Sequence, residues 1–229
     1  MIVGLLHPGE MGAAVGAAAD TEVIWASEGR SEATRARAAS FRDAGTLGAL
    51  AAEADVILSI CPPDAALEVA HACAGFDGIY VDANAISPAR AREIGKLHPR
   101  YVDGGIIGGP DAPALCLSGD EAPTVAALFP TLETRIVPDA SALKMVYAAW
   151  SKGTAAMLLA IRGVAVHYGV EDEWRTAAPE LVERLARAEA AAASKGWRWV
   201  GEMEEIADTF AAAGRPDGFH RAAAEVFRT

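Results

Sequence analysis

Short runs of branched apolar residues alternate with alanine-rich amphipathic stretches over the first 138 residues of the chain. Such runs, bounded by glycine, proline or aspartate, are typical of buried strands, and the stretches between them have the period of helices. Alternating strands and helices predict βαβ units, with a mostly parallel sheet covered by helices on both faces. We predict strands at residues 2–6, 22–25, 56–60, 79–82, 101–103, 115–118 and 135–137, and helices at 12–19, 31–43, 47–53, 65–73, 88–96 and 122–128.

After Pro138 the pattern contains helices only. We predict a Rossmann-like, doubly wound α/β domain over residues 1–138 and a small all-α domain over residues 139–229. The alanine-rich helical part offers little core of its own, so we expect it to pack against a second copy of the chain in a homodimer. Its predicted helices lie at residues 140–168, 179–194, 201–213 and 219–227.

Composition narrows the class of protein. Hydrophobic residues make up 52% of the 229 residues, which is enough for a sizeable core, and the formal net charge is −11. That charge argues against nucleic acid or an anionic membrane as the main partner, because phosphate binding needs clustered lysine and arginine. No apolar run reaches the roughly 18 residues of a membrane helix, and neither the cysteines nor the histidines have metal-ligand spacing. We expect a cytoplasmic protein with a small-molecule substrate and no metal.

A glycine turn follows the first predicted strand. Gly9 and Gly12 fit the last two glycines of the pattern G-x-G-x-x-G, and His7 stands at the first glycine position. Such a turn lets a pyrophosphate rest on the amide groups at a helix N-terminus. A purely structural turn is the alternative, but the place of the turn in a βαβ series favours the dinucleotide loop. The candidate cofactor loop comprises His7, Pro8, Gly9, Glu10, Met11 and Gly12.

Four ordered motifs resemble the β-hydroxyacid dehydrogenase and 6-phosphogluconate dehydrogenase superfamily. Residues 4–12 resemble its opening, and residues 82–88 its Asp-x-Ser-Thr-x-x-Pro segment. Residues 103–109 are similar to its substrate loop, and residues 140–145 to the start of the helix that carries its catalytic lysine. The opening and the run at residues 201–207 are similar to a poorly characterised bacterial branch. The resemblance implies hydride transfer between a nicotinamide cofactor and a small β-hydroxyacid, carbonyl or imine-like substrate.

The end of the second strand bears on the choice of cofactor. Arg30 offers a forked contact for the 2′-phosphate of NADP, supported by the hydroxyls of Ser27 and Ser31, so we favour NADP. Glu28 could instead favour NAD, and Ser31 could simply cap a helix. The resemblance also implies that the turn at Cys61 and Pro62 lies beside the cofactor. Asn84 is a candidate for the nicotinamide end or a plain turn residue.

By the resemblance, Lys144 is the general acid/base. Ala148 and Ile107 stand where the family carries an asparagine and a serine that hold the substrate, so we expect a more apolar substrate than hydroxyisobutyrate. These losses also support a rival interpretation, in which the chain is a catalytically silent dinucleotide-binding sensor or partner-binding protein. The candidate substrate contacts are the amide run Ile107, Gly108 and Gly109, together with Tyr147 and Ser151 at helical spacing from the lysine.

Overall fold

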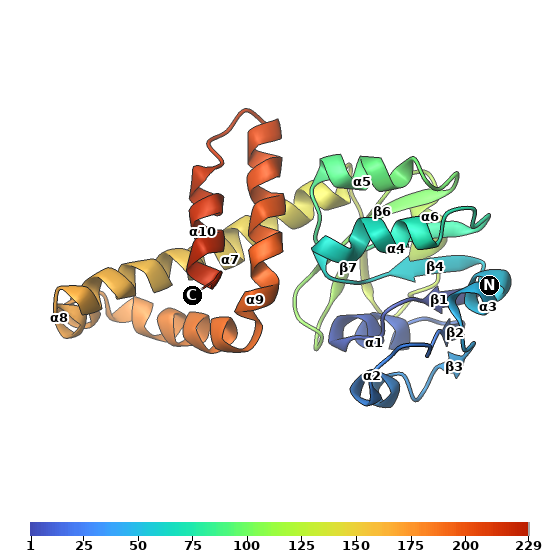
Figure 1. Ribbon diagram of the computed structural model, residues 1–229, viewed down its shortest axis with the longest axis horizontal. Coiled ribbons are helices and arrows are strands. Elements are labelled where there is room, and N and C mark those ends of the chain that lie inside the picture. The colour runs from blue at the N-terminus through green and yellow to red at the C-terminus, as the bar shows by residue number, and fades with distance from the viewer. Residues whose placement is uncertain (229) are drawn as a thin grey trace. The chain divides into compact units, whose positions relative to one another are not determined.

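The computed structural model describes residues 1–228 and divides into two compact units, Met1–Lys144 (unit 1) and Met145–Thr229 (unit 2). Unit 1 holds an eight-stranded sheet in the order β3-β2-β1-β4-β5-β6-β7-β8 (Figure 1). Every neighbouring pair of strands is parallel except β6 and β7. The strands are β1 (Ile2–Leu5), β2 (Glu22–Trp25), β3 (Arg42–Asp43), β4 (Val56–Ser59), β5 (Ile79–Asp82), β6 (Tyr101–Ile107), β7 (Ala114–Ser118) and β8 (Glu133–Ile136).

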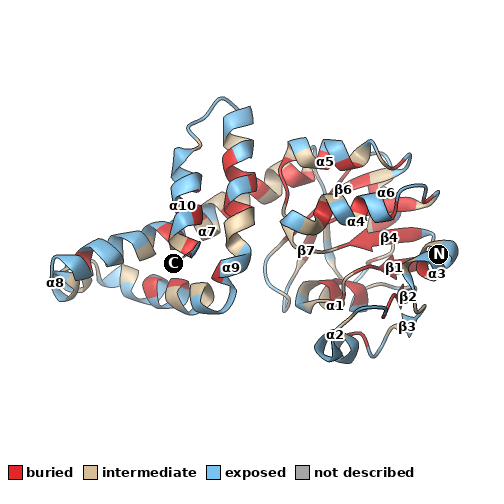
Figure 2. Ribbon diagram, in the orientation of Figure 1, coloured by how far each residue is buried: buried red, intermediate tan, exposed pale blue. Residues whose placement is uncertain are grey.

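Helices pack on both faces of this sheet. Val3 and Leu5 point to the face where residues of α1 (Glu10–Ala17) and α6 (Ala122–Ala126) lie. Ile57 and Tyr80 point to the opposite face, with α3 (Leu47–Glu53), α4 (Ala66–Ala72) and α5 (Pro88–Gly95). The strands between these layers are buried throughout the centre of the sheet (Figure 2). The predicted doubly wound, mostly parallel α/β fold is therefore confirmed, with a short α2 (Glu32–Arg37) and η1 (Pro63–Ala65) in its connections.

The predicted helix at residues 31–43 is wrong in its second half. The helix ends at Arg37, and Arg42–Asp43 form the edge strand β3, which pairs in parallel with β2. The buried Ala38 and the ring of Phe41, which packs on the core, turn the chain back toward the sheet. A two-residue strand carries no periodic pattern, so only its pairing partner defines it.

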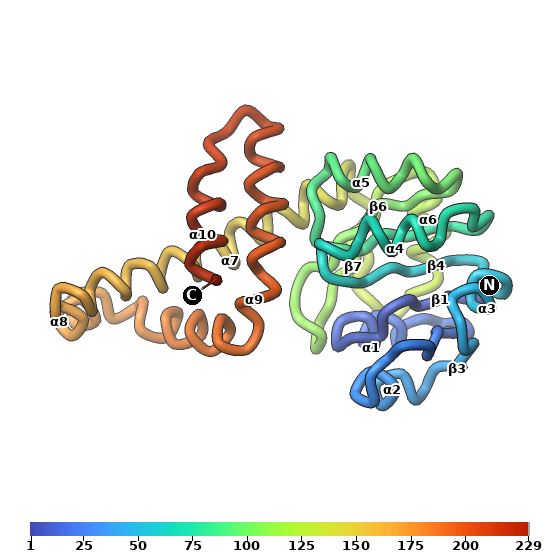
Figure 3. The backbone as a smooth tube through the Cα atoms, in the orientation of Figure 1, coloured from blue at the N-terminus to red at the C-terminus, as the bar shows by residue number. Residues whose placement is uncertain are grey.

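Among the residues described, unit 2 contains helices joined by turns and no strand. The helix α7 (Ala140–His167) begins in unit 1 and continues into unit 2, and the domain boundary we expect after residue 138 stays a prediction. The helix α9 (Val182–Ala212) changes direction along its course, and α10 (Gly218–Arg228) returns beside it (Figure 3). The rings of Trp199 and Phe227 join these two helices, with centroids 5.1 Å apart.

Two helix predictions in this unit need correction. The segments predicted as separate helices at residues 179–194 and 201–213 belong to the one 31-residue helix α9 after a single turn, η2 (Pro179–Leu181). Gly196 within α9 is buried beside Phe227, so tertiary packing offsets the low helix propensity of glycine. The helix α8 (Glu171–Ala177), which the pattern did not predict, follows α7.

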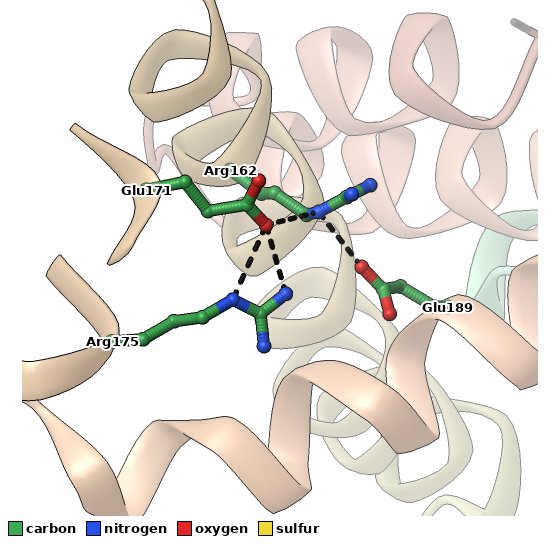
Figure 4. A network of polar contacts seen from close by, with 4 residues as sticks. All are labelled: Arg162, Glu171, Arg175 and Glu189. Carbon is green, nitrogen blue, oxygen red and sulfur yellow. Dashed lines mark hydrogen bonds and ion pairs between the residues drawn. The ribbon is translucent and has the colours of Figure 1, made fainter. Parts of the chain in front are cut away.

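A network of ion pairs links α8 to the neighbouring helices α7 and α9 (Figure 4). Glu171 of α8 accepts from Arg162 of α7 at 2.9 Å and from Arg175 of α8 at 2.8 Å. Arg162 also lies 3.0 Å from Glu189 of α9. Hydrogen bonds from Arg175 and Arg162 lower the pKa of Glu171. The pair between Glu171 and Arg175 lies within α8, and Arg162 connects Glu171 of α8 with Glu189 of α9.

Candidate functional site

The turn between β1 and α1, together with the start of α1 (residues 7–12), is the candidate phosphate loop. Gly9 is the N-cap of α1 in extended conformation, and no side chain caps the helix. A Cβ atom on Gly12 would lie 2.4 Å from the carbonyl oxygen of His7, whereas a Cβ atom on Gly9 would meet nothing within 4 Å. Gly12 thus lets the helix approach the loop closely, and Gly9 leaves open space in front of the helix N-terminus.

Two of the remaining loop residues, Pro8 and Met11, pack within the protein, and their side chains leave the helix N-terminus open. Pro8 is buried and its carbonyl oxygen accepts from Arg37 at 3.4 Å. Met11 packs against the core, while the Glu10 side chain is exposed. The loop therefore offers backbone amides, and not the Glu10 carboxylate, to a ligand at the helix N-terminus.

His7, in this loop, is influenced by the charge of Arg30. Burial, together with the charge of Arg30, lowers the pKa of His7 to about 4, so its imidazole is neutral at pH 7. His7 Nδ1 and Arg30 Nε are both buried and lack a hydrogen-bond partner within residues 1–228. Buried polar atoms are normally paired, so two unpaired ones beside a phosphate loop fit an anionic ligand.

The other residues predicted for the 2′-phosphate, Ser27 and Ser31, make hydrogen bonds within the protein. The Ser27 amide donates to Asp43 Oδ1 at 3.3 Å, and its carbonyl oxygen accepts from Arg35 at 2.8 Å. Ser31 Oγ accepts from the amide of Thr34 at 3.3 Å and caps α2, which was the alternative interpretation. Sequence reasoning missed Asp43, because its segment was assigned to a helix.

Asn84 connects the carboxyl ends of β4 and β5. Its Oδ1 accepts from the Cys61 amide at 2.5 Å, and its Nδ2 donates to Ser59 Oγ at 3.2 Å. Burial, reinforced by the charge of Asp82, raises the pKa of the Cys61 thiol to about 12 and keeps it protonated. Pro62 follows without an amide donor. Asn84 therefore shapes the turn at Cys61 from within the protein.

Asp82, which sequence reasoning did not single out, is wholly buried at the end of β5. Its Oδ1 accepts from the Asn84 amide at 3.0 Å, and its Oδ2 has no hydrogen-bond partner in the described part of the chain. Burial raises the pKa of Asp82 to about 7. The aspartate that opens the motif at residues 82–88 thus supports the Asn84 turn.

Lys144 lies at the carboxyl end of β6. Its Nζ donates to the carbonyl oxygen of Ile106 at 2.8 Å, and Gly105 leaves room for the lysine Cβ, which a Cβ atom on Gly105 would approach to 2.9 Å. Beyond Ile107, Gly108 adopts φ +91°, and a Cβ atom there would lie 2.6 Å from the Ala112 carbonyl oxygen. Gly109 follows in open space.

Strand direction brings these segments to one edge of the sheet. The strands β1, β4, β5 and β6 are neighbours and run parallel, so their carboxyl ends share that edge. The glycine turn, the Cys61 turn and Asn84 follow the ends of β1, β4 and β5, and the Ile106 carbonyl that holds Lys144 lies in the last residues of β6. Ligands of open parallel sheets bind outside this edge, where the connections diverge to opposite faces.

Of the remaining predicted residues, Tyr147 and Ser151 belong to unit 2, where Ser151 Oγ donates to the Tyr147 carbonyl oxygen at 3.0 Å.

Two structural findings concern membranes and metals. Within residues 1–228, the helices fall short of the length and apolarity that crossing a membrane requires. Among the same residues, no three His, Cys, Asp or Glu side chains are grouped to hold a metal ion.

Comparison with known proteins supports the fold. Residues 165–229 match the family described as "domain of unknown function (DUF1932)". The chain is similar to the solved structure of the conserved protein MTH1747, of unknown function, whose description reports similarity to 3-hydroxyacid dehydrogenases. The identity is 24% and the TM-score 0.72, over 100% of this chain and 96% of that one. No curated protein sequence matches the chain.

The chain is also similar to two structures that were solved with bound small molecules. One is the 3-hydroxyisobutyrate dehydrogenase of Mycobacterium tuberculosis with L-serine, at 18% identity and TM-score 0.68, over 99% of this chain and 92% of that one. The other is Psf3 in complex with NADP+, at 17% identity and TM-score 0.66, over 99% and 93%. The chain therefore has the fold of 3-hydroxyacid dehydrogenase-like proteins, which it shares with NAD(P)-dependent dehydrogenases and reductases.

Proposed function

We propose that this protein is an NADP(H)-dependent oxidoreductase that acts on a small β-hydroxyacid, carbonyl or imine-like substrate, with Lys144 as general acid/base. The observation that carries the proposal is the position of the Lys144 amine, fixed on the Ile106 carbonyl at the sheet edge that also bears the phosphate loop. An amine at this edge can exchange a proton with a substrate atom there.

The residues present fit a dinucleotide. The amides at the start of α1 would hold the diphosphate, and Arg30 would hold a 2′-phosphate. A bound nicotinamide supplies or accepts the hydride. In reduction, Lys144 Nζ donates a proton to the carbonyl oxygen or imine nitrogen of the substrate, and in oxidation it takes the proton back. The amides of Gly108 and Gly109 would bind a substrate carboxylate, in place of the serine for which Ile107 stands.

The direct test is a thermal-shift titration with NADPH and NADH, followed by a panel of carbonyl and imine substrates with the preferred cofactor. At a hundredfold excess over the dissociation constant, a true cofactor adds about 2.7 kcal/mol to the free energy of unfolding. Stabilisation by neither nucleotide would contradict the proposal. Binding without turnover of any substrate would support the rival sensor, which Ala148 and Ile107 favour because neither can hydrogen-bond a substrate through its side chain.

Arg30→Ala tests the cofactor preference. Loss of a charge-assisted phosphate contact should weaken NADPH binding by about ten- to hundredfold and leave the NADH affinity nearly unchanged. Fluorescence titration of both nucleotides measures the two dissociation constants. Arg42→Ala is the control, because Arg42 is paired with Glu22 and Glu53 on the β3 edge. Equal losses for NADPH and NADH in Arg30→Ala would contradict the 2′-phosphate role.

We also propose that the protein is a homodimer through an apolar stripe on α7. At 100° per residue, the exposed members of this stripe fall within about 60° of the helix circumference. Of the thirteen large hydrophobic residues that are exposed within residues 1–228, eleven lie in unit 2, so unit 2 has apolar surface left to bury. The stripe consists of Val146, Trp150, Met157, Ile161, Val164 and Tyr168, the last just beyond the helix end.

Val164→Glu should dissociate this dimer, because an unpaired carboxylate would be buried within an apolar interface. Val166→Glu is the matched control. It introduces the same charge two residues away on the opposite side of the helix, at a valine that is also exposed. Light scattering should give twice the chain mass of 23.7 kDa for the wild type and Val166→Glu, and the single-chain mass for Val164→Glu. A monomeric wild type would refute the dimer.

A further inference from the structure

Side-chain oxygens accept hydrogen bonds from the backbone amides at the start of α7. A helix begins with four backbone amides that lack partners inside the helix. Here Ser118 Oγ accepts from the amide of the first residue, Ala140, at 3.0 Å, and Asp139 Oδ1 accepts from that of the third, Ala142, at 2.7 Å. The second amide, that of Ser141, donates to Asp103 Oδ2 at 2.9 Å. Three successive amides therefore each have a side-chain acceptor.

Asp103 is the centre of this arrangement. Its Oδ1 accepts from Ser141 Oγ, and its Oδ2 also accepts from Ser118 Oγ at 3.0 Å. Asp103 and Ser118 lie opposite each other in the β6–β7 pair, and Ser141 is fully buried. One carboxylate thus joins two strands of the sheet to the first turn of α7. Burial raises the pKa of Asp103, while the hydrogen bonds from Ser141 and Ser118 act against this rise.

The same strand contacts the helix again one turn later. Ser141 and Lys144 are three residues apart, about 4.5 Å along the helix axis. Between these contacts, a Cβ atom on Gly105 would lie 3.0 Å from the carbonyl oxygen of Ala140 and 2.9 Å from the Lys144 Cβ. The amine itself is bonded to Ile106, three residues after Asp103. The backbone of β6 and the start of α7 therefore lie in direct contact from Asp103 to the lysine amine.

We propose that Asp103 is a positioning residue for Lys144, which it acts on through Ser141 and the first turn of α7. Its carboxylate holds the helix start in register with β6, so that the lysine amine stays on the Ile106 carbonyl at the carboxyl edge of the sheet. The significance for catalysis rests on the proposed function of Lys144, whereas the positioning itself can be measured without any substrate.

The test compares Asp103→Asn with Asp139→Asn. Both variants remove one negative charge beside the N-terminus of α7 and so lose the same kind of helix-dipole interaction. Of these two aspartates, only Asp103 belongs to β6 and connects that strand to the helix. Lysine reactivity is measured by trace acetylation with acetic anhydride and mass spectrometry, with Lys96, Lys152 and Lys195 as internal references among the four lysines. Lys144 labelling should rise by roughly three- to tenfold in Asp103→Asn, and stay at the wild-type rate in Asp139→Asn.

Unchanged Lys144 labelling in Asp103→Asn, or an equal rise in Asp139→Asn, would overturn the proposal. If Asp103→Asn does not fold, Ser141→Ala decides, because it removes one hydroxyl bond to the carboxylate and keeps the amide bond. Its Lys144 labelling must then rise relative to the reference lysines, and a wild-type rate would overturn the proposal.

Turnover separates this inference from the proposed function. With a substrate from the panel, Asp103→Asn should lower kcat by about ten- to hundredfold, and leave KM and the NADPH dissociation constant within about twofold. Asp103→Glu, which restores the charge, should recover part of kcat. A wild type without NADPH binding or turnover would refute the proposed function, while the labelling result would still decide the role of Asp103.

Discussion

Replacing Gly12 with alanine is expected to abolish NADPH binding at micromolar concentrations. The new methyl group would lie 2.4 Å from the carbonyl oxygen of His7, which is backbone and cannot rotate away as a side chain can. Either α1 or the loop must move, and the amides at the helix start would lose their alignment. Loss of two charge-assisted amide bonds to phosphate corresponds to about a hundredfold or more in the dissociation constant. Titration calorimetry with NADPH measures this loss directly.

Variants of two other glycines distinguish an effect on NADPH binding from an effect on the stability of the fold. Gly48→Ala introduces a methyl group into open space on the exposed side of α3, and is expected to be neutral or to stabilise by about 0.5–1 kcal/mol. Gly9→Ala also meets open space, at φ −69°, so its melting temperature should match that of the wild type. Because Gly9 is the N-cap of α1, we expect its methyl group to crowd a diphosphate at the helix N-terminus, so the NADPH affinity should fall. Unimpaired NADPH binding by both Gly12→Ala and Gly9→Ala would contradict the phosphate loop.

The fold could be predicted from the sequence because most strands of unit 1 are apolar runs with clear ends. The boundaries of β2 and β5 were predicted to the residue, and each strand has a charged residue at one end, Glu22 and Asp82. The edge strand β3 was missed because its two residues, Arg42 and Asp43, are polar and exposed. Such a strand exists through its pairing with β2, which no local pattern records.

The candidate site likewise contains residues whose positions follow from a local sequence pattern and residues whose contacts depend on the tertiary structure. Residues that directly follow strands were predictable, since parallel strands bring their carboxyl ends to one edge. The positions of the glycine turn at residues 7–12 and of the turn at Cys61 are of this kind, while their role in binding a cofactor stays a prediction. The contacts made by Asp103 were not predictable, because they depend on the β6–β7 register and on where α7 meets the sheet. The two inward bonds of Asn84 depend likewise on the separation of β4 and β5.

Lys144→Gln is expected to retain NADPH binding and to lose nearly all turnover. Glutamine keeps an N–H donor for the Ile106 carbonyl, so the contact between α7 and β6 can survive, but its amide cannot donate a proton to a substrate or accept one at neutral pH. General acid/base catalysis contributes about 10²–10⁴-fold, and kcat should fall by that factor. NADPH oxidation followed by absorbance, with the best substrate of the panel, measures the loss, and calorimetry measures the NADPH affinity.

The control and the rescue make this result specific to the Lys144 amine. Lys96→Gln removes an exposed lysine after α5, and should leave both kcat and the NADPH affinity at the wild-type level. Lys144→Ala leaves space where the side chain lay, so added ethylamine should restore part of its turnover and none of that of Lys144→Gln. Turnover by Lys144→Gln at the wild-type rate would exclude the lysine as acid/base. If Lys144→Gln is inactive and ethylamine restores activity to Lys144→Ala, the missing group is an amine, because an amine supplied from solution can replace a lost proton donor but cannot repair a distorted sheet edge.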